Sequence, residues 1–264
     1  MSVVFLLAHF DDEYCALPLI LEAQTADEAC WFLYVADYRD PANAAVRLAE
    51  TRAFLRRFGV PADRALHVGA GSGVFDGQVC DGILPRLARL RAAIARIGPV
   101  GRLVTPAWEG GHPDHDSCAA MASILGAELD ATVLQFGLYN GRKVLRPFYR
   151  ACSPLAENGP AIGVPLKTGQ WLAWLAAVRF FPSQTWNWLG LFPSMFLTFA
   201  ERRGFAVQTL KPQRIGERPH AGRLHYEWMF RTPYARVRAA VDAALAAQRP
   251  GRARIRKKPA SMST

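Results

Sequence analysis

One short stretch near the N-terminus concentrates side chains that bind metal ions and transfer protons. A histidine and three carboxylates follow directly after the apolar residues 3–7: His9, Asp11, Asp12 and Glu13. An apolar run of this kind is typical of a buried strand, and ligands of α/β sheets bind where strands reach their carboxyl ends. One histidine and two aspartates at such a place could hold a divalent metal ion and leave one carboxylate for proton transfer.

A second stretch supplies further histidines and carboxylates. Residues 106–116 follow a predicted strand over residues 102–105 and contain His112, Asp114 and His115. The carboxyl ends of parallel strands share one edge of a sheet, so we expect the two stretches to meet there. A hydrolytic zinc site uses three protein ligands and keeps one position for water, and the metal lowers the pKa of that water to ~7.

Together the two stretches can provide every group that metal-assisted hydrolysis needs. Three side chains would form the ligand set: His9, Asp12 and His115. Asp11 would then be free to take a proton from the water. His112 could protonate the leaving group or stabilise the oxyanion, with Asp114 orienting its ring. Metal binding alone needs neither Asp11 nor His112, so their presence favours a hydrolase over a passive metal-binding protein.

These stretches resemble the two motifs of the PIG-L/LmbE family of metal-dependent de-N-acetylases. The family's A-H-P-D-D-E corresponds to residues 8–13, and its H-P-D-H corresponds to residues 112–115. The resemblance implies zinc ligands at three positions: His9, Asp12 and His115. It also implies that Asp11 is the general base and that His112 is the auxiliary acid. By the same resemblance, the implied activity is removal of an acetyl group from an amino sugar.

Three further residues are candidates for contact with substrate. Arg47 and Glu50 resemble an Arg-x-x-Glu of the family whose arginine contacts substrate, although an exposed helix often carries such a pair. The one departure from the motifs is Phe10, where the family usually has proline. Because proline restrains a loop, Phe10 would alter the shape of the loop or line the substrate pocket. Trp108, beside the second stretch, could stack on a sugar ring.

The elements that must position these residues predict an α/β fold. Strands are expected over residues 3–7, 29–35, 65–68, 102–105 and 131–136, and they alternate with helices over residues 13–23, 41–58, 84–97 and from the second stretch to about residue 126. This alternation is typical of a Rossmann-like, doubly wound and mainly parallel sheet. The glycine-rich residues 69–77 lack the Lys-Ser/Thr of a P-loop, so they do not favour nucleotide binding.

The second half of the chain predicts an aromatic-rich cap of helices and strand. We expect residues 1–160 to form the catalytic core and residues 161–248 to complete the same domain. Residues 167–199 contain four tryptophans and five phenylalanines but no unbroken apolar span of ~20 residues, so a transmembrane helix is not expected. This segment would wall the active site or, alternatively, meet a lipid-linked substrate at a membrane. A closing strand is expected over residues 224–230, before a helix over residues 233–247.

Charge and cysteine usage indicate which ligands and which cellular compartment suit the protein. A formal net charge of +10 over 264 residues suits an anionic ligand, a membrane surface or nucleic acid. Part of the excess lies in residues 249–264, expected to be a disordered basic tail, so nucleic-acid binding is not favoured. The five cysteines show no CxxC spacing and indicate buried thiols in a reducing compartment. No signal peptide is visible, which favours a cytoplasmic enzyme with peripheral membrane contact as an alternative.

These features predict a zinc-dependent hydrolase, with Fe²⁺ as an alternative metal. The expected reaction removes an acetyl or other small acyl group from the amine of an N-acylated amino sugar, such as a derivative of N-acetylglucosamine in a glycolipid, glycan precursor or secondary metabolite. An anionic or lipid-linked substrate is compatible with the sequence. One alternative is an amidase acting on a thiol-sugar or glycosylated-antibiotic conjugate. Another is a metal- or carbohydrate-binding module without catalysis. The sequence does not specify the oligomeric state.

Overall fold

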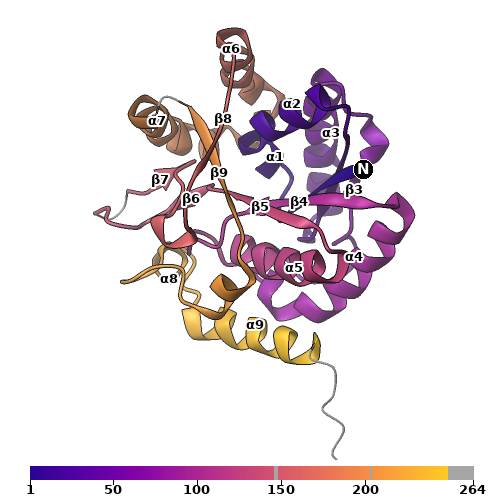
Figure 1. Ribbon diagram of the computed structural model, residues 1–264, viewed down its shortest axis with the longest axis vertical. Helices are drawn as coiled ribbons and strands as arrows, with labels where there is room; N and C mark the ends of the chain where they lie inside the picture. The colour runs from indigo at the N-terminus through magenta and orange to yellow at the C-terminus, as the bar shows by residue number, and fades with distance from the viewer. Residues whose placement is uncertain (146–147, 203, 249–264) are drawn as a thin grey trace, which may run out of the picture.

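A seven-stranded sheet forms the centre of the computed structural model, which describes residues 1–145, 148–202 and 204–248 (Figure 1). Its strand order is β3-β2-β1-β4-β5-β9-β8. The strands span Ser2–Leu7 (β1), Ala29–Tyr34 (β2), Ala65–His67 (β3), Val100–Pro106 (β4), Thr132–Phe136 (β5), Ile162–Val164 (β8) and Phe205–Thr209 (β9). Strands β1 to β5 are parallel, whereas β9 runs antiparallel to both β5 and β8. This arrangement confirms the predicted doubly wound, mainly parallel α/β fold.

The strands form where the sequence has continuous apolar runs. A parallel sheet is covered by helices on both faces, so both sides of each central strand must be apolar. Five of the six residues of β1 are buried, and the rings of Phe5 and Phe32 stack at 4.6 Å between neighbouring strands. The order of the strands reverses between β1 and β4, which lie side by side. Ligands of such sheets bind in the crevice at this reversal.

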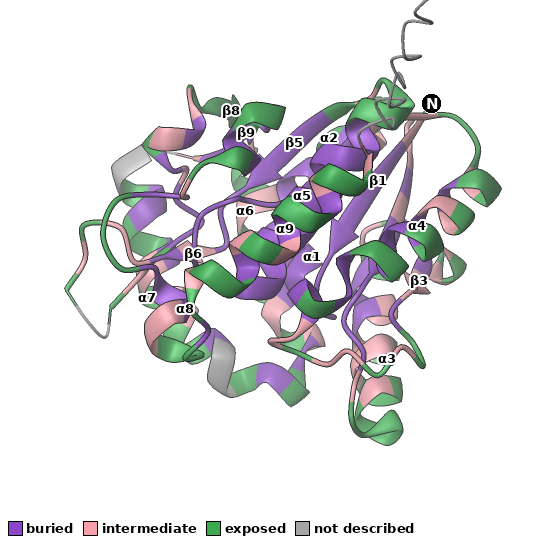
Figure 2. Cartoon of the chain, turned by 90° about the horizontal axis from the view of Figure 1, so that it is seen from below, coloured by how far each residue is buried: buried purple, intermediate pink, exposed green. Residues whose placement is uncertain are grey.

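Helices cover the two faces of the sheet in separate layers (Figures 1 and 2). One layer contains α1 (Asp12–Cys15), α2 (Leu17–Thr25), α3 (Pro41–Arg57), α6 (Thr168–Ala177) and α7 (Thr185–Arg202), and the other contains α4 (Ile83–Ile97), α5 (Pro113–Leu129) and α9 (Tyr234–Gln248). Helix α3 begins as expected, because the Asp40 side chain accepts the N–H of Ala42 and Pro41 occupies the first turn.

Two sequence-based expectations about secondary structure are wrong. Residues 13–23 form two helices, since Pro18 has no N–H to continue the first one through Ala16. Residues 224–230 contain helix α8 (His225–Met229) in place of a closing strand. There the Glu227 carboxylate accepts the N–H of Leu224, and Gly110 accepts the N–H of His225, so this backbone has no strand partner to join.

The aromatic segment folds into α6 and α7, which pack on the sheet and on α1. Trp174 is 1% exposed, and its indole N–H donates to the carbonyl of Tyr14 at 2.8 Å. Strands β8 and β9 extend the same sheet as the N-terminal strands, while β6 (Tyr139–Asn140) and β7 (Arg150–Ala151) form a separate hairpin. None of the described helices combines the length and the apolar character needed to cross a bilayer.

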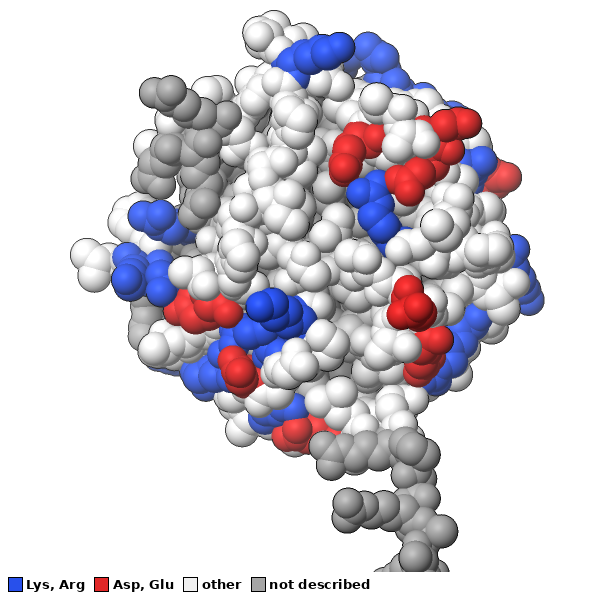
Figure 3. All heavy atoms as spheres, in the orientation of Figure 1, with Lys and Arg blue, Asp and Glu red and all other residues white. Residues whose placement is uncertain are grey.

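Some of the sequence-based expectations concern residues that the structure does not describe, and others are confirmed. The expected basic tail, residues 249–264, and the side chain of Trp186 lie outside the described part of the chain. The division at residue 160 remains a prediction. All five cysteines are buried free thiols, as expected. On the face shown in Figure 3, charged side chains gather in separate groups, and the strip over β8 and β9 is nearly free of them.

Replacement of Trp174 by alanine should lower the free energy of unfolding by about 3–5 kcal/mol, because it removes a fully buried aromatic side chain and leaves a cavity. Leu172 lies on the same helix but is 63% exposed, so Leu172→Ala should change stability by no more than about 0.5 kcal/mol. Urea denaturation of both variants measures the difference. Equal losses in the two variants would contradict the packing of α6 described above.

Candidate metal and catalytic site

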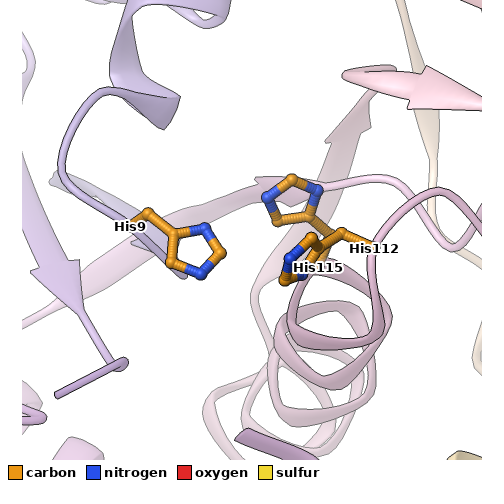
Figure 4. Close-up of side chains that lie close together, drawn as sticks. All are labelled: His9, His112 and His115. Atoms are coloured by element: carbon orange, nitrogen blue, oxygen red, sulfur yellow. The ribbon is translucent and has the colours of Figure 1, made fainter. Parts of the chain in front are cut away.

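The loops that follow β1 and β4 meet at the carboxyl edge of the sheet, where the strand order reverses. A pocket of about 410 Å³ lies at this point. Its lining includes six of the residues predicted from the sequence: His9, Asp11, Asp12, Arg47, His112 and His115. Figure 4 shows three histidine rings close together, one from the loop after β1 and two from the start of α5. The two motifs therefore form one site.

Asp12 lies between two of the histidines. Its Oδ1 atom is 3.2 Å from Nε2 of His115 and 3.9 Å from Nδ1 of His9. Its other oxygen, Oδ2, accepts the backbone N–H groups of Ala8 and His9, each at 2.9 Å. These two hydrogen bonds hold the carboxylate so that Oδ1 faces the imidazoles. Burial alone would raise the pKa of Asp12, but the adjacent imidazoles of His115 and His9 bring it well below its usual range.

The donor atoms around Asp12 fit a divalent metal ion. His115 is only 3% exposed, and its ring nitrogens make no hydrogen bond among the described residues, although Nε2 lies 3.2 Å from the Asp12 carboxylate. Buried ring nitrogens without a hydrogen bond are unfavourable, and a metal ion bound to Nε2 would satisfy this one. Two imidazoles and one carboxylate form a ligand set of catalytic zinc sites. The residues His9, Asp12 and His115 could therefore hold such an ion.

The carboxylate of Asp114 is within hydrogen-bonding distance of the His9 ring. Its Oδ2 atom lies 3.1 Å from Nε2 of His9, and its carboxylate accepts the N–H groups of Gly77 and Val79 at 2.7 and 2.9 Å. A carboxylate in this position orients a metal-binding imidazole and leaves the other ring nitrogen, Nδ1, for the metal. Burial acts to lower the pKa of His9, but Asp76, Asp114 and Asp12 raise it well above its usual value.

The orientation of His112 is set by backbone. Its Nδ1 atom accepts the N–H of Asp114 at 3.1 Å, whereas the Asp114 carboxylate lies 3.9 Å away. The predicted contact between Asp114 and His112 is thus made by the main chain of Asp114. A neutral His112 carries its proton on Nε2, because Nδ1 already accepts a hydrogen bond. Burial lowers the pKa of His112, with the carboxylate of Asp76 opposing this shift.

Asp76 belongs to the site but was not identified in the sequence. Its Oδ1 atom lies 3.1 Å from Nε2 of His9 and 3.3 Å from Nε2 of His112. The charge on His9 outweighs burial and brings the pKa of Asp76 well below its usual range. The residue stands in the glycine-rich loop after β3, which ends at the same edge of the sheet. The sequence could have indicated Asp76 only as a carboxylate in a loop that ends at the same edge of the sheet.

Asp11 has the environment of a proton acceptor. Burial raises its pKa to about 7, although the guanidinium of Arg47 acts in the opposite direction. Nη2 of Arg47 lies 3.2 Å from Oδ1 of Asp11. The backbone of Asp11 has φ of 115°, a conformation that favours glycine, and its N–H donates to Oε2 of Glu13. A carboxylate with a pKa near neutrality is suited to general-base catalysis.

Arg47 and Glu50 make separate contacts instead of pairing along the helix. Arg47 donates to the carbonyl of Phe10 at 2.6 Å, in addition to its ion pair with Asp11. Glu50 accepts both the N–H and the hydroxyl of Ser183, at 3.0 and 2.5 Å. Arg47 therefore faces the pocket, and Glu50 attaches the aromatic segment to α3.

Two of the residues expected to contact substrate do not line the pocket. Phe10 is 1% exposed and stacks on Tyr38, so it belongs to the core. Trp108 is fully buried, and its indole N–H donates to the carbonyl of Glu217 at 3.1 Å. The expectation that these two rings contact substrate is wrong, because they pack in the core and do not line the pocket, whereas an effect of Phe10 on the shape of the loop stays a prediction. Four other aromatic side chains line it: Tyr139, Tyr149, Trp188 and Phe230.

Comparison with solved structures identifies proteins that share this architecture. A deacetylase of teicoplanin biosynthesis is 18% identical, with a TM-score of 0.58 over 80% of this chain and 97% of its own. The chain has the fold of that deacetylase. N,N'-diacetylchitobiose deacetylase from Pyrococcus horikoshii is 14% identical, with a TM-score of 0.52 over 83% and 87% of the two chains.

A hydratase shares the same fold at a lower score. The 4-carboxy-2-hydroxymuconate hydratase GalB from Pseudomonas putida is 14% identical, with a TM-score of 0.50 over 80% of this chain and 95% of its own. No protein-family model and no curated protein sequence matches the chain. The likeness to the two deacetylases agrees with the motif resemblance to the PIG-L/LmbE family, but at these identities it establishes the fold alone.

Zn²⁺ should stabilise the folded protein, because its ligands are gathered only in that state. Free ion at ~100 times its Kd would add about 2.7 kcal/mol to the free energy of unfolding. His115→Ala should remove most of this gain, since it deletes one ligand. His220→Ala, which changes a buried histidine bonded to Ala221 and outside the pocket lining, should retain it. Thermal unfolding with and without the ion tests this, and equal stabilisation of the two variants would refute the ligand set.

Proposed function

We propose that this protein is a metal-dependent deacetylase that hydrolyses the N-acetyl group of an amino sugar or of its conjugate. One observation carries the proposal. A metal-type ligand set, a carboxylate with a raised pKa and a histidine that presents Nε2 line the same pocket. The likeness to deacetylases of teicoplanin biosynthesis and of diacetylchitobiose supports it. The fold alone would not, since the hydratase shares it.

The metal we propose is Zn²⁺, with Fe²⁺ as the alternative that the same ligand types accept. A bound divalent ion supplies Lewis acidity toward the amide carbonyl and lowers the pKa of water. Three side chains would hold it: His9, Asp12 and His115. A solved structure of a teicoplanin deacetylase is described as a zinc-inhibited form. Assays should therefore compare one equivalent of zinc with an excess.

The protein's own side chains account for the proton transfers. Asp11 takes a proton from the attacking water, whose oxygen adds to the carbonyl carbon of the amide. His112 donates a hydrogen bond from Nε2 to the oxygen that becomes negative. The proton that Asp11 has taken from water then passes to the departing nitrogen. The carbon–nitrogen bond breaks, and acetate and a free amine leave. Arg47 keeps Asp11 in place through its ion pair.

We further propose that the sugar carries an apolar group. A second groove of about 640 Å³ lies beside the catalytic pocket, and Tyr149 and Gly190 line both. Helix α7 places Leu189 and Leu197 at this groove, where they are 60% and 67% exposed. Exposed apolar side chains beside a catalytic pocket are suited to an alkyl or aryl aglycone. The two lining residues that the groove shares with the pocket support binding of one amphipathic substrate across both.

Replacement of Asp11 by asparagine should lower the rate of acetate release by about 10²–10⁴-fold, because the variant has no base to take the proton of water. The stabilisation by Zn²⁺ should persist, since Asp11 is not in the ligand set. Acetate release is measured on a panel of N-acetylglucosamine derivatives, chitobiose and a glycosylated antibiotic. Asp27→Asn, at the opposite edge of the sheet, is the matched control and should keep full activity. An Asp11→Asn variant with full activity would disprove the assigned base.

Leu197→Glu should raise KM for the octyl glycoside of N-acetylglucosamine about tenfold, because the introduced charge opposes burial of the alkyl chain. KM for the methyl glycoside should stay the same. Leu172→Glu changes a similarly exposed leucine on α6, outside the groove, and should affect neither substrate. Steady-state kinetics of the wild type and the two variants with both glycosides measures this effect. An equal rise for both glycosides would argue against an aglycone site in the groove.

A further inference from the structure

Both backbone polar groups of Phe10, inside the loop that carries the proposed ligands, have hydrogen-bond partners. Its N–H donates to the hydroxyl of Tyr38 at 3.0 Å. Its carbonyl accepts the guanidinium of Arg47 at 2.6 Å. Buried backbone N–H and C=O groups need such partners, because losing one costs the full desolvation of the group. Tyr38 therefore restrains the peptide group that precedes Phe10, and Arg47 restrains the one that follows it.

The same tyrosine also holds the side chain of Phe10. The two rings stack at 5.1 Å with an angle of 1° between their planes. His67 and Tyr34 contact the other sides of the Phe10 ring, at centroid distances of 4.9 and 4.8 Å. The guanidinium of Arg47 lies 5.1 Å above the ring of Tyr38. Tyr38 thus joins the metal loop to the arginine that pairs with the proposed base.

Tyr38 is itself held in place in the loop that follows β2. Its N–H donates to Oδ1 of Asp37, whose Oδ2 accepts the N–H of Gly73. Gly73 precedes Asp76 in the glycine-rich loop, and Asp37 pairs with Phe75 there in a β-bridge. Asp37 therefore connects Tyr38 to the glycine-rich loop, which carries Asp76.

We propose that Tyr38 is a positioning residue for the metal loop and that its hydroxyl is required because position 10 is not proline. Proline would restrain the loop by its ring and would have no N–H to satisfy. Phe10 has an N–H, and the conformation that follows it, φ of 115° at Asp11, is one that costs free energy outside glycine. Tyr38 supplies the missing restraint through one hydrogen bond and one stacked ring.

The test is a double-mutant cycle that combines Tyr38→Phe with Phe10→Pro. In the wild-type background Tyr38→Phe leaves the buried N–H of Phe10 without its partner, and affinity for Zn²⁺ should fall on the order of tenfold. With proline at position 10 the same change should alter affinity by less than about twofold, because no N–H is present. Chelator competition measures the affinity, and urea denaturation of the metal-free protein measures the same coupling without any metal.

Two further variants separate the hydrogen bond from general effects. Phe10→Ala removes the ring but keeps the N–H, so Tyr38→Phe should remain costly in that background. Tyr226→Phe removes another buried hydroxyl, one without a hydrogen-bond partner among the described residues, and should change nothing. If Tyr38→Phe were equally costly with phenylalanine and with proline at position 10, the proposal would be wrong. It would also fail if Tyr38→Phe changed neither affinity nor unfolding.

The activity readout rests on the proposed deacetylase function, whereas the other two do not. We expect kcat for acetate release to follow the same pattern as the affinity, with KM little changed, because Tyr38 acts on the loop and not on the sugar. Absence of acetate release in the wild-type protein would count against the function alone. Absence of coupling in both affinity and unfolding would count against the role of Tyr38.

Discussion

Buried carboxylates that accept backbone N–H groups hold the loops at the carboxyl edge of the sheet in place. Asp12 accepts the N–H groups of residues 8 and 9, and Asp114 accepts one from the glycine-rich loop and one from residue 79 just after it. Asp116 accepts those of residues 109 and 110, and Glu109 accepts those of residues 138 and 139. A hydrogen bond to a charged group contributes about 1.5–3 kcal/mol. The loops that carry the chemistry are therefore attached to one another through acidic side chains.

This construction has an electrostatic consequence for the site. Carboxylates that face imidazoles, such as Asp12 and Asp76, have pKa values well below their usual range. The side chain of Asp11 is 14% exposed, and desolvation outweighs the guanidinium of Arg47, its strongest favourable charge, so its pKa rises to about 7. The surroundings thus lower the pKa of Asp12 and raise that of its neighbour Asp11. That separation allows one carboxylate to serve as ligand while the next moves a proton.

Sequence reasoning could locate the site because strands and polar loops are local features. The apolar runs of β1 and β4 placed His9 and His115 at one edge of a parallel sheet, which is where they lie. The directions of Phe10 and Trp108 could not be predicted, since each depends on distant partners such as Tyr38 and the carbonyl of Glu217. Asp76 was missed because a lone aspartate among glycines carries no periodic signal. Helix α8 was mistaken for a strand because its cap, Glu227, and its backbone partner, Gly110, act through the fold.

A loop can keep one geometry through different sets of restraints. The segment from His9 to Asp12 must present two ligands and a base within four residues, which leaves little freedom in its backbone. A proline would remove that freedom within the chain itself. Here the restraint comes from Tyr38, in the loop after β2, and from Arg47 on α3, so the loop depends on the packing of the sheet edge for its shape. The metal site therefore depends on the tertiary core more than the motif alone suggests, and a change in the loop after β2 reaches the site through a single hydroxyl group.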